Sequence, residues 1–390
     1  MKSVPLADVL DSSKSGFASG KRDAEGVIQL RMNNVTSEGA LDLSKLTRIP
    51  ATRKQIEAAT LQRGDVLFNC TNSPELVGKS CYFPGSDEPF VFSNHFVRLR
   101  AKPSDLDSQY LARWLASVRL AGHFEHGCVR WVNQATFRKE DLLALKIPLP
   151  PLPEQKRIAK ILDAADALRA KRRESLAQLD ALLQSTFLEM FGDPVENPKG
   201  LEMRPMGEVC DVRDGTHDSP KYQDSGFPLL TSKNFRNGQI DYDGAALISE
   251  EDFRQINRRS KVDVGDLVMP MIGTIGNPVL VTDEPRFAIK NVALIKFLPN
   301  SPDNYYVRTL LTSHYFDHIT SKSNRGGTQK FVALKDLRSL PLPIPPAPAQ
   351  QKFRATVCSI EQHAELNRTH ATHLDTLFAS LQQRAFAGQL

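Results

Sequence analysis

The chain has 390 residues, of which 41% are hydrophobic, and a formal net charge of +5. This length allows two or three domains with substantial cores, and the slight excess of Lys and Arg permits an anionic partner without requiring one. The cysteines are scattered without the spacing of a zinc site, and no apolar leader or run of 18 apolar residues occurs. We therefore expect a cytoplasmic protein with reduced thiols, no bound metal and no membrane segment.

A proline-rich segment occurs twice, and each copy leads into a helical pattern. The first copy covers 147–155 and the second covers 342–350, about 195 residues later, so that Gln155 corresponds to Gln350. Because proline cannot continue a helix ladder and stiffens an extended chain, each copy is expected to be a rigid strut before a helix start. The sequence therefore predicts two similar halves, each a globular unit followed by a long helix.

The segments that follow the two struts show the apolar spacing of a coiled coil, with steps that alternate between three and four residues. Each segment is expected to form a helix of about 35 residues, or about 50 Å. One polar residue interrupts each series near its middle, Arg172 in the first and Asn367 in the second. We expect the two helices to pair, and separate packing of each helix on its own domain is the alternative. The apolar positions are Ile158, Ile161 or Leu162, Ala165, Leu168, Leu176, Leu179, Leu183, Phe187 and Met190 in the first series, and Phe353, Val357, Ile360, Ala364, Ala371, Leu374, Phe378, Leu381 and Ala385 in the second.

The two globular units share a common framework of short apolar strands and turns. The turn Gly64-Asp65 before one strand corresponds to Gly265-Asp266 before another. One or two helices are expected in each unit, for example over Asp107–Leu120 and Asn304–Ile319, so both units are predicted to be α+β. The predicted domains are 1–146 (first globular unit), 147–192 (strut and first helix), 193–340 (second globular unit) and 341–390 (strut and second helix).

Polar residues suited to DNA contacts gather where the two units differ most in sequence. Arg and Lys suit guanine and Asn and Gln suit adenine in the major groove, whereas Arg and Lys beside glycine suit phosphates. For any single residue, ordinary turn chemistry, in which Asn and Ser satisfy their own backbone, is the alternative. The candidates are Arg31, Asn33, Asn34, Thr71, Asn72, Ser73, Arg130, Asn133 and Gln134 in the first unit, and Thr231, Lys233, Asn234, Arg236, Thr274, Asn277, Arg325, Thr328 and Lys330 in the second.

Catalytic motifs are missing from the sequence. It contains no Walker A loop, GxGxxG, HExxH or GxSxG motif, and no Asn/Asp-Pro-Pro-aromatic signature of an adenine methyltransferase. His370 and His373 have the i,i+3 spacing of a metal pair, but solvated helix histidines are the expectation. The sequence therefore favours a binding protein with two binding domains and no catalytic residues.

Taken together, these features closely resemble the specificity subunit of type I restriction-modification systems. The resemblance covers nearly the whole chain. It departs from the family at Cys70, where one subtype of recognition domain commonly has Arg, and at Ala349, where the strut usually has Glu. The segments that carry the resemblance are 72–79, 147–158, 187–194 and 381–388.

The resemblance implies two target recognition domains held by an antiparallel coiled coil, each reading one half of an asymmetric bipartite site in double-stranded DNA. It also implies that the chemistry lies in partners. Two modification subunits would carry S-adenosylmethionine and methylate adenine N6, motor-nuclease subunits would add cleavage, and this chain would bind no cofactor. A specificity subunit of a methylation-only or other defence complex remains an alternative, as does a bivalent protein-binding scaffold.

Overall fold

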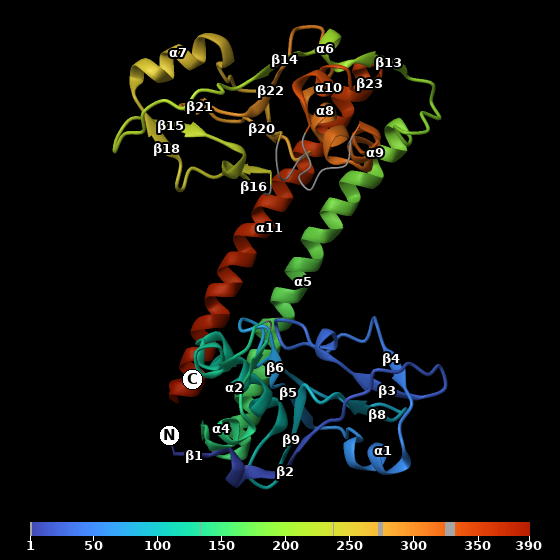
Figure 1. The fold of residues 1–390 in the computed structure, drawn as a ribbon, viewed down its shortest axis with the longest axis vertical. Helices are drawn as coiled ribbons and strands as arrows, with labels where there is room; N and C mark the ends of the chain where they lie inside the picture. The colour runs from blue at the N-terminus through green and yellow to red at the C-terminus, as the bar shows by residue number, and fades with distance from the viewer. Residues whose placement is uncertain (1, 133, 237, 272–275, 324–331) are drawn as a thin grey trace. The chain divides into compact units, whose positions relative to one another are not determined.

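The computed structural model describes residues 2–132, 134–236, 238–271, 276–323 and 332–390. The chain divides into two compact units, one made of Met1–Arg173 with Thr369–Leu390 and the other of Glu174–Arg368. Each unit therefore contains one α+β domain together with part of each long helix (Figure 1). The mixed α and β composition of both units confirms the predicted fold class.

The first unit is built around a four-stranded antiparallel sheet with the order β2-β9-β5-β7. Val66 and Leu99 are neighbours in the sheet and are fully buried against Tyr110 and Leu115 of helix α2. Asp107 caps this helix, since its side chain accepts the backbone N–H of Tyr110, and the predicted helix is confirmed with Asp107 as its cap. The elements are β2 (Leu10–Ser15), β5 (Asp65–Asn69), β7 (Ser80–Tyr82), β9 (Phe96–Ala101) and α2 (Ser108–Leu120).

Two smaller sheets complete the first domain. In the first, β3 pairs antiparallel with β4 and parallel with β8, over a separate apolar core that includes Leu30 and Phe92. In the second, the order is β10-β11-β6. The elements are β1 (Ser3–Pro5), η1 (Leu6–Val9), β3 (Val27–Leu30), η2 (Met32–Asn34), β4 (Thr47–Ile49), α1 (Arg53–Ala59), β6 (Thr71–Asn72), β8 (Phe90–Phe92), α3 (His123–Gly127), β10 (Val129–Arg130), β11 (Ala135–Thr136), α4 (Lys139–Ala144) and β12 (Lys146–Pro148).

The second unit repeats this plan with its own sheets, β14-β22-β19-β20 and β18-β15-β21. In both units the strut strand pairs antiparallel with the first strand of the domain, β12 with β1 and β23 with β13. The elements are β13 (Glu202–Pro205), α6 (Met206–Val209), β14 (Asp211–Asp214), β15 (Phe227–Leu230), η3 (Ser232–Asn234), β16 (Phe235–Arg236), β17 (Gln239–Ile240), β18 (Ala246–Ile248), α7 (Glu250–Ser260), β19 (Leu267–Pro270), β20 (Val279–Leu280), β21 (Ala288–Ile289), β22 (Val292–Lys296), α8 (Asn304–Thr312), α9 (His314–Ser323), α10 (Leu334–Arg338) and β23 (Pro341–Ile344).

The single helix predicted over Asn304–Ile319 is wrong, because the chain forms two helices there. Ser313 lies between them with extended backbone angles, φ −86° and ψ 170°. Its hydroxyl accepts the N–H of Tyr315 and so caps the second helix, in the way that serine competes with the helix backbone. The break turns Tyr315 and Phe316 into the core, where both are at least 98% buried.

The two long helices are α5 (Leu152–Phe191), with 40 residues, and α11 (Ala347–Ala387), with 41 residues. In the first unit, Arg169 of α5 forms an ion pair with Asp375 of α11 at 2.6 Å. In the second unit, Phe187 of α5 packs edge-on against Phe353 of α11 with ring centroids 5.6 Å apart. Because the later residue of α5 meets the earlier residue of α11, the helices run antiparallel, which confirms the predicted pairing.

Most predicted seam positions are buried or half-buried, but Leu168 is 54% exposed and its assignment to the seam is wrong. Arg169 occupies the seam instead. Its guanidinium lies over the ring of Phe378, 4.4 Å from the centroid, and pairs with Asp166 and Asp375. A planar cation that stacks on an aromatic ring can fill an apolar position when its donors are satisfied, and apolar spacing alone does not reveal this.

Candidate nucleic-acid interface

A buried glutamine locks the first strut to its recognition domain. Gln155 is fully buried, and its side-chain oxygen accepts the backbone N–H of Asp107 at 2.8 Å. Its side-chain nitrogen donates to the carbonyls of Pro150 and Asp105, both at 2.9 Å. Since Asp107 caps α2, a single carboxamide joins the strut, the start of α5 and the start of α2.

The second strut carries the same lock. The side chain of Gln350 accepts the N–H of Asp303 at 2.6 Å and donates to the carbonyl of Pro345 at 2.7 Å. Asp303 caps α8 as Asp107 caps α2. The repeated proline-glutamine motif therefore has a structural explanation, which is to hold each recognition domain at a fixed orientation on its own helix start.

A buried tyrosine strengthens each lock. The hydroxyl of Tyr110 donates to the carbonyl of Pro148 at 2.8 Å, and that of Tyr306 donates to the carbonyl of Pro343 at 2.7 Å. Burial raises the pKa of both phenols, so both remain neutral donors. The carbonyls of the proline struts are thus satisfied by side chains rather than by water.

An ion pair crosses the main sheet at the equivalent place in each domain. Arg100 holds Asp65 through two hydrogen bonds of 2.7 and 2.8 Å, and the Asp65 side chain is 1% exposed. In the second domain Lys296 binds Asp266 at 2.5 Å. Burial raises the pKa of the Asp266 carboxyl. Both cations are bound within their domains and are therefore poor candidates for DNA phosphates.

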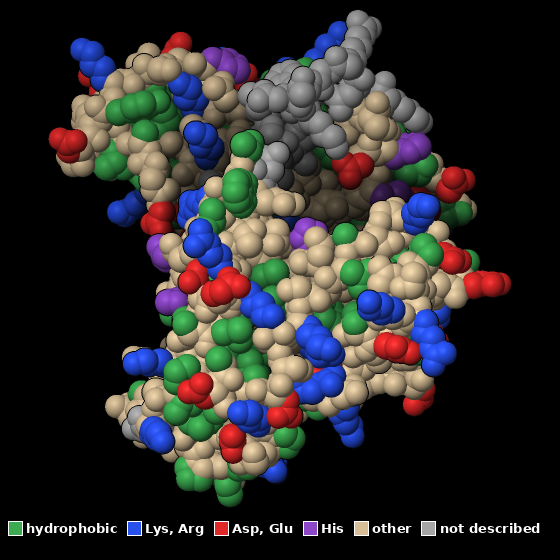
Figure 2. Space-filling model, turned by 60° about the horizontal axis from the view of Figure 1, so that its bottom comes forward, with side chains coloured by type: hydrophobic (Ala, Val, Ile, Leu, Met, Phe, Trp, Pro, Cys, Tyr) green, Lys and Arg blue, Asp and Glu red, His purple; other side chains and the backbone are tan. Residues whose placement is uncertain are grey.

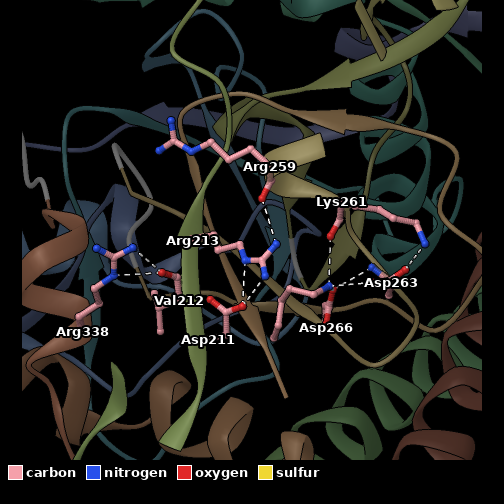
Figure 3. Close-up of polar contacts among 9 residues, drawn as sticks. Asp211, Val212, Arg213, Arg259, Lys261, Asp263, Asp266 and Arg338 are labelled. Atoms are coloured by element: carbon pink, nitrogen blue, oxygen red, sulfur yellow. Dashed lines mark hydrogen bonds and ion pairs between the residues drawn. The ribbon is translucent and has the colours of Figure 1, made fainter. Parts of the chain in front are cut away.

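Further basic residues around this second-domain pair are also occupied (Figure 3). Arg213 contacts Asp211 at 2.6 Å and also donates to the carbonyl of Arg259. Arg338 donates twice to the carbonyl of Val212, at 2.7 and 3.0 Å. These guanidinium groups brace β14 against α7 and α10, so formal charge alone does not identify the DNA-facing side.

The distribution of charge on the surface leads to the same conclusion. On the face that Figure 2 displays, Lys and Arg side chains are interspersed with Asp and Glu. The described side chains form no continuous basic surface on that face. Charge alone therefore does not single out a nucleic-acid-binding area on that face.

The small sheet of the first domain brings together predicted residues from two separate stretches. Strand β11 pairs with β6, so that Thr136 faces Thr71, and it also pairs with β10, so that Ala135 faces Arg130. The hydroxyls of Thr71 and Thr136 are 3.2 Å apart. Arg130 and Gln134 are exposed next to these strands. The sheet thus places a cation, an amide and a hydroxyl on one structural element.

Asn72 and Ser73 belong to the same region, but both are used in local turn contacts. Asn72 donates to the side chain of Asn69 at 2.6 Å and accepts the N–H of Ser73 at 2.9 Å. The Ser73 hydroxyl donates to Glu75 at 2.6 Å. These contacts are the ordinary turn chemistry that was the alternative to DNA contact for both residues.

Asn34 and Asn234, both predicted to contact DNA, lie in the interior of their domains. They are 2% and 6% exposed. Asn34 accepts the N–H of Arg31 and donates to the carbonyls of Asp42 and Lys45, at 2.9 to 3.0 Å. A side chain whose donors and acceptor are all engaged inside a loop cannot also contact a base.

Asn234 makes the equivalent contacts in the second domain. It accepts the N–H of Thr231 at 2.9 Å and donates to the carbonyl of Asp241 at 3.0 Å. In both domains the asparagine closes a 3₁₀ turn and braces the loop that follows it. The sequence pattern correctly marked a repeated element, but the element is structural.

The remaining candidates are spread over other loops. Arg31 is half-buried and donates to the carbonyl of Ser19, whereas Asn33 is exposed. In the second unit Lys233 and Asn277 are exposed. For Arg236 the structure describes only its place in β16. The candidates outside the described residues are Asn133, Thr274, Arg325, Thr328 and Lys330.

Two exposed apolar residues between predicted candidates were missed from the sequence. Trp131 is 66% exposed and Val132 is 98% exposed, and both follow β10 directly. The signal in the sequence is a tryptophan that directly follows Arg130 and precedes a polar turn. Large aromatic side chains are seldom left exposed, so a tryptophan in a polar turn indicates a contact surface.

Within the described residues, no group of three or more His, Cys, Asp and Glu side chains is arranged to hold a metal ion. Among the helices described, none has the length and apolar character needed to cross a membrane.

The fold defines a protein with two similar α+β domains, each packed on parts of an antiparallel helix pair. The chain belongs to the family described as the type I restriction modification DNA specificity domain, whose model matches residues 1–179 and 198–372. Both halves of the chain are thus matched by the same family model.

Known relatives agree with this membership. The putative type I restriction enzyme MjaX specificity subunit of Methanocaldococcus jannaschii is 25% identical over 403 residues, covering 99% of this chain and 92% of the relative. The MjaVIII specificity subunit of the same organism is 24% identical over 319 residues, covering 77% and 74%.

Solved structures share the fold. The type I restriction-modification S subunit from M. genitalium has a TM-score of 0.60 at 16% identity, covering 99% of this chain and 96% of its own. A chain from a structure of a type I R-M system, solved to explain complex assembly and conformational transition, has a TM-score of 0.55 at 19% identity, covering 100% and 98%.

Proposed function

We propose that this chain is the DNA-sequence specificity subunit of a type I restriction-modification complex, and that each domain reads one half of a bipartite site in double-stranded DNA. The observation that carries the proposal is the duplication: one specificity-domain model matches both halves, and the same glutamine lock recurs in both. Because the polar loops of the two domains differ in sequence, the two half-sites should also differ.

In the first domain, the sheet β10-β11-β6 is the best supported reading surface. The exposed Arg130 suits a phosphate, which positions the protein without reading sequence. The exposed Gln134 and the nearby hydroxyl of Thr71 suit base edges. In the second domain the exposed Lys233 and Asn277 are the corresponding candidates among the residues that the structure describes.

The chain is proposed to supply recognition and no catalysis. Its sequence lacks the adenine methyltransferase signature and the nucleotide-binding loops of a motor. Partner subunits are therefore proposed to carry the chemistry: two modification subunits that bind S-adenosylmethionine and methylate adenine N6, and motor-nuclease subunits that cleave. This chain itself would bind no cofactor, and the complex would act in the cytoplasm.

The decisive experiment is genome-wide mapping of N6-methyladenine in a methylation-free host that expresses this chain with its modification subunit. A split asymmetric motif that vanishes when this chain is omitted would support the proposal. Exchange of residues 1–146 for another recognition domain should then change one half of the motif only. Soluble, assembled complex without any methylated motif would contradict the proposal, and methylation without cleavage would identify a methylation-only system.

A further inference from the structure

The tip of the β10–β11 hairpin combines exposed apolar side chains with a rigid support. Trp131 and Val132 are 66% and 98% exposed. The hairpin closes behind them, since the N–H of Trp131 donates to the carbonyl of Gln134 at 2.6 Å. Hydrophobic groups held this far into solvent usually mark a contact surface, because exposure gains nothing for folding.

An aromatic cluster anchors the base of this hairpin. Phe137, directly after β11, is 3% exposed and packs edge-on against Phe124 with ring centroids 5.0 Å apart. Phe68 of the main sheet joins the same cluster at 6.2 Å from Phe137. The backbone N–H of Phe137 also donates to the carbonyl of Cys70 at 2.9 Å. The tip is thus presented by a preorganised support, which lowers the entropy lost on binding.

The surroundings of the tip favour a nucleic acid over a protein. From residue 127 to residue 139 the sequence contains Arg130, Arg138 and Lys139 and no Asp or Glu. Arg130 and Arg138 are exposed. A protein-binding hot spot is usually ringed by further contact residues that exclude water, whereas here the neighbouring strands carry cationic and polar side chains.

We propose that the hairpin sets Trp131, supported by Val132, against a base step of the half-site read by the first domain. This inference rests on the proposed DNA-reading function and adds a specific contact to it. The indole would stack on an exposed base face or wedge into the step, while Arg130 holds the adjacent phosphate. Such a contact would favour base steps that unstack easily, so the half-site would depend on DNA deformability as well as on base edges.

Affinity measurements on the assembled complex with its modification subunits test the proposal. Trp131→Ala should weaken binding to cognate DNA about 5- to 150-fold, the range expected for one aromatic-base contact. Trp131→Phe should retain most of the affinity, and the salt dependence of binding should not change in either variant, because no charge is removed. Leu298→Ala, at a residue that is 55% exposed in the second domain, is the matched control and should bind as the parent does.

Tryptophan fluorescence gives an independent measurement. The chain has two tryptophans, and the other, Trp114, is 5% exposed. The difference between the parent complex and the Trp131→Phe complex therefore isolates the signal of Trp131. Cognate DNA should quench this signal and protect it from acrylamide. Unchanged affinity of Trp131→Ala and unchanged acrylamide access to Trp131, with sequence-specific binding intact, would overturn the inference alone.

Two further outcomes have distinct meanings. If Trp131→Ala prevents assembly with the modification subunit but leaves DNA affinity unchanged, then the tip is a protein contact and the inference is wrong. If the parent complex shows no sequence-specific DNA binding, then both the proposed function and the inference that rests on it are wrong.

Discussion

The side chain of Gln155 accepts the backbone N–H of Asp107 at 2.8 Å, and Gln350 accepts that of Asp303 in the same way at 2.6 Å. In both halves a residue at a helix start thereby fixes the cap of another helix 47 or 48 residues earlier. Together with the tyrosine hydroxyl and the paired strut strand, this carboxamide holds each recognition domain on its helix start. Removing it should therefore affect both stability and DNA reading.

Gln155→Leu should lower the free energy of unfolding of the first unit by about 2 to 3 kcal/mol, because it leaves the N–H of Asp107 and the carbonyl of Pro150 buried without partners. Denaturant unfolding followed by circular dichroism would measure the loss. Gln383→Leu, at an exposed position of α11, is the matched control and should change stability by less than about 0.5 kcal/mol. Equal stability of the two variants would contradict the proposed lock.

Asn234→Ala should destabilise the second domain without changing the DNA motif. The side chain is 6% exposed and holds Thr231 and the loop at Asp241, so its loss should cost about 1 to 3 kcal/mol. The melting temperature and the methylated motif should be measured on the same variant. A relaxed motif with unchanged stability would restore Asn234 as a base-reading residue.

The contrast between these glutamines and asparagines shows what sequence alone can reveal. The duplication, the struts and the antiparallel helices follow from repeated proline and from apolar spacing, which are properties of the chain itself. The roles of Asn34 and Asn234 do not, since the same residue type suits a base edge and a loop brace equally well. Only burial separates the two uses, and burial depends on contacts between distant parts of the chain.

Other differences between the sequence-based predictions and the structure have the same physical origin, which is contact between distant parts of the chain. The placement of Leu168 failed because Arg169 takes its position in the seam by stacking on Phe378, a contact between residues far apart in sequence. The helix break at Ser313 depends on the burial of Tyr315 and Phe316. Trp131 is unusual because of its exposure, which is a property of the folded chain and cannot be predicted from the residue type.

Arg130 and Gln134 lie near each other on the hairpin and should behave differently when removed. Arg130→Ala should weaken binding to all sequences and reduce the slope of log affinity against log salt by about 0.9, as expected for one phosphate contact. Gln134→Ala should leave that slope unchanged and cost about 1 to 3 kcal/mol of discrimination at one base pair. Salt titrations on cognate and single-mismatch duplexes separate the two effects. Identical behaviour of the two variants would remove the distinction between positioning and reading at this sheet.

The pH dependence of the second unit should depend on His217. Its Nδ1 lies 2.7 Å from the side-chain oxygen of Asn291 and its Nε2 lies 2.9 Å from Asp214, so both ring nitrogens face acceptors. The hydrogen bond to Asn291 and the contact with Asp214 raise the pKa of His217 above its ordinary value of 6.5. The folded form therefore binds the proton more tightly than the unfolded form does, and the resulting stability is fully present below pH 6.5 and is lost as the pH rises through the folded pKa.

His217→Gln should accordingly lower the melting temperature more at about pH 5 than at a pH above the folded pKa, where the imidazole of the parent has lost its proton. His373→Gln, at an exposed position of α11, serves as the control and should show no such trend. Proton NMR titration of the His217 ring would locate the folded pKa directly. The same difference in melting temperature at both pH values, or a folded pKa below 6.5, would show that the two acceptors do not hold a protonated imidazole.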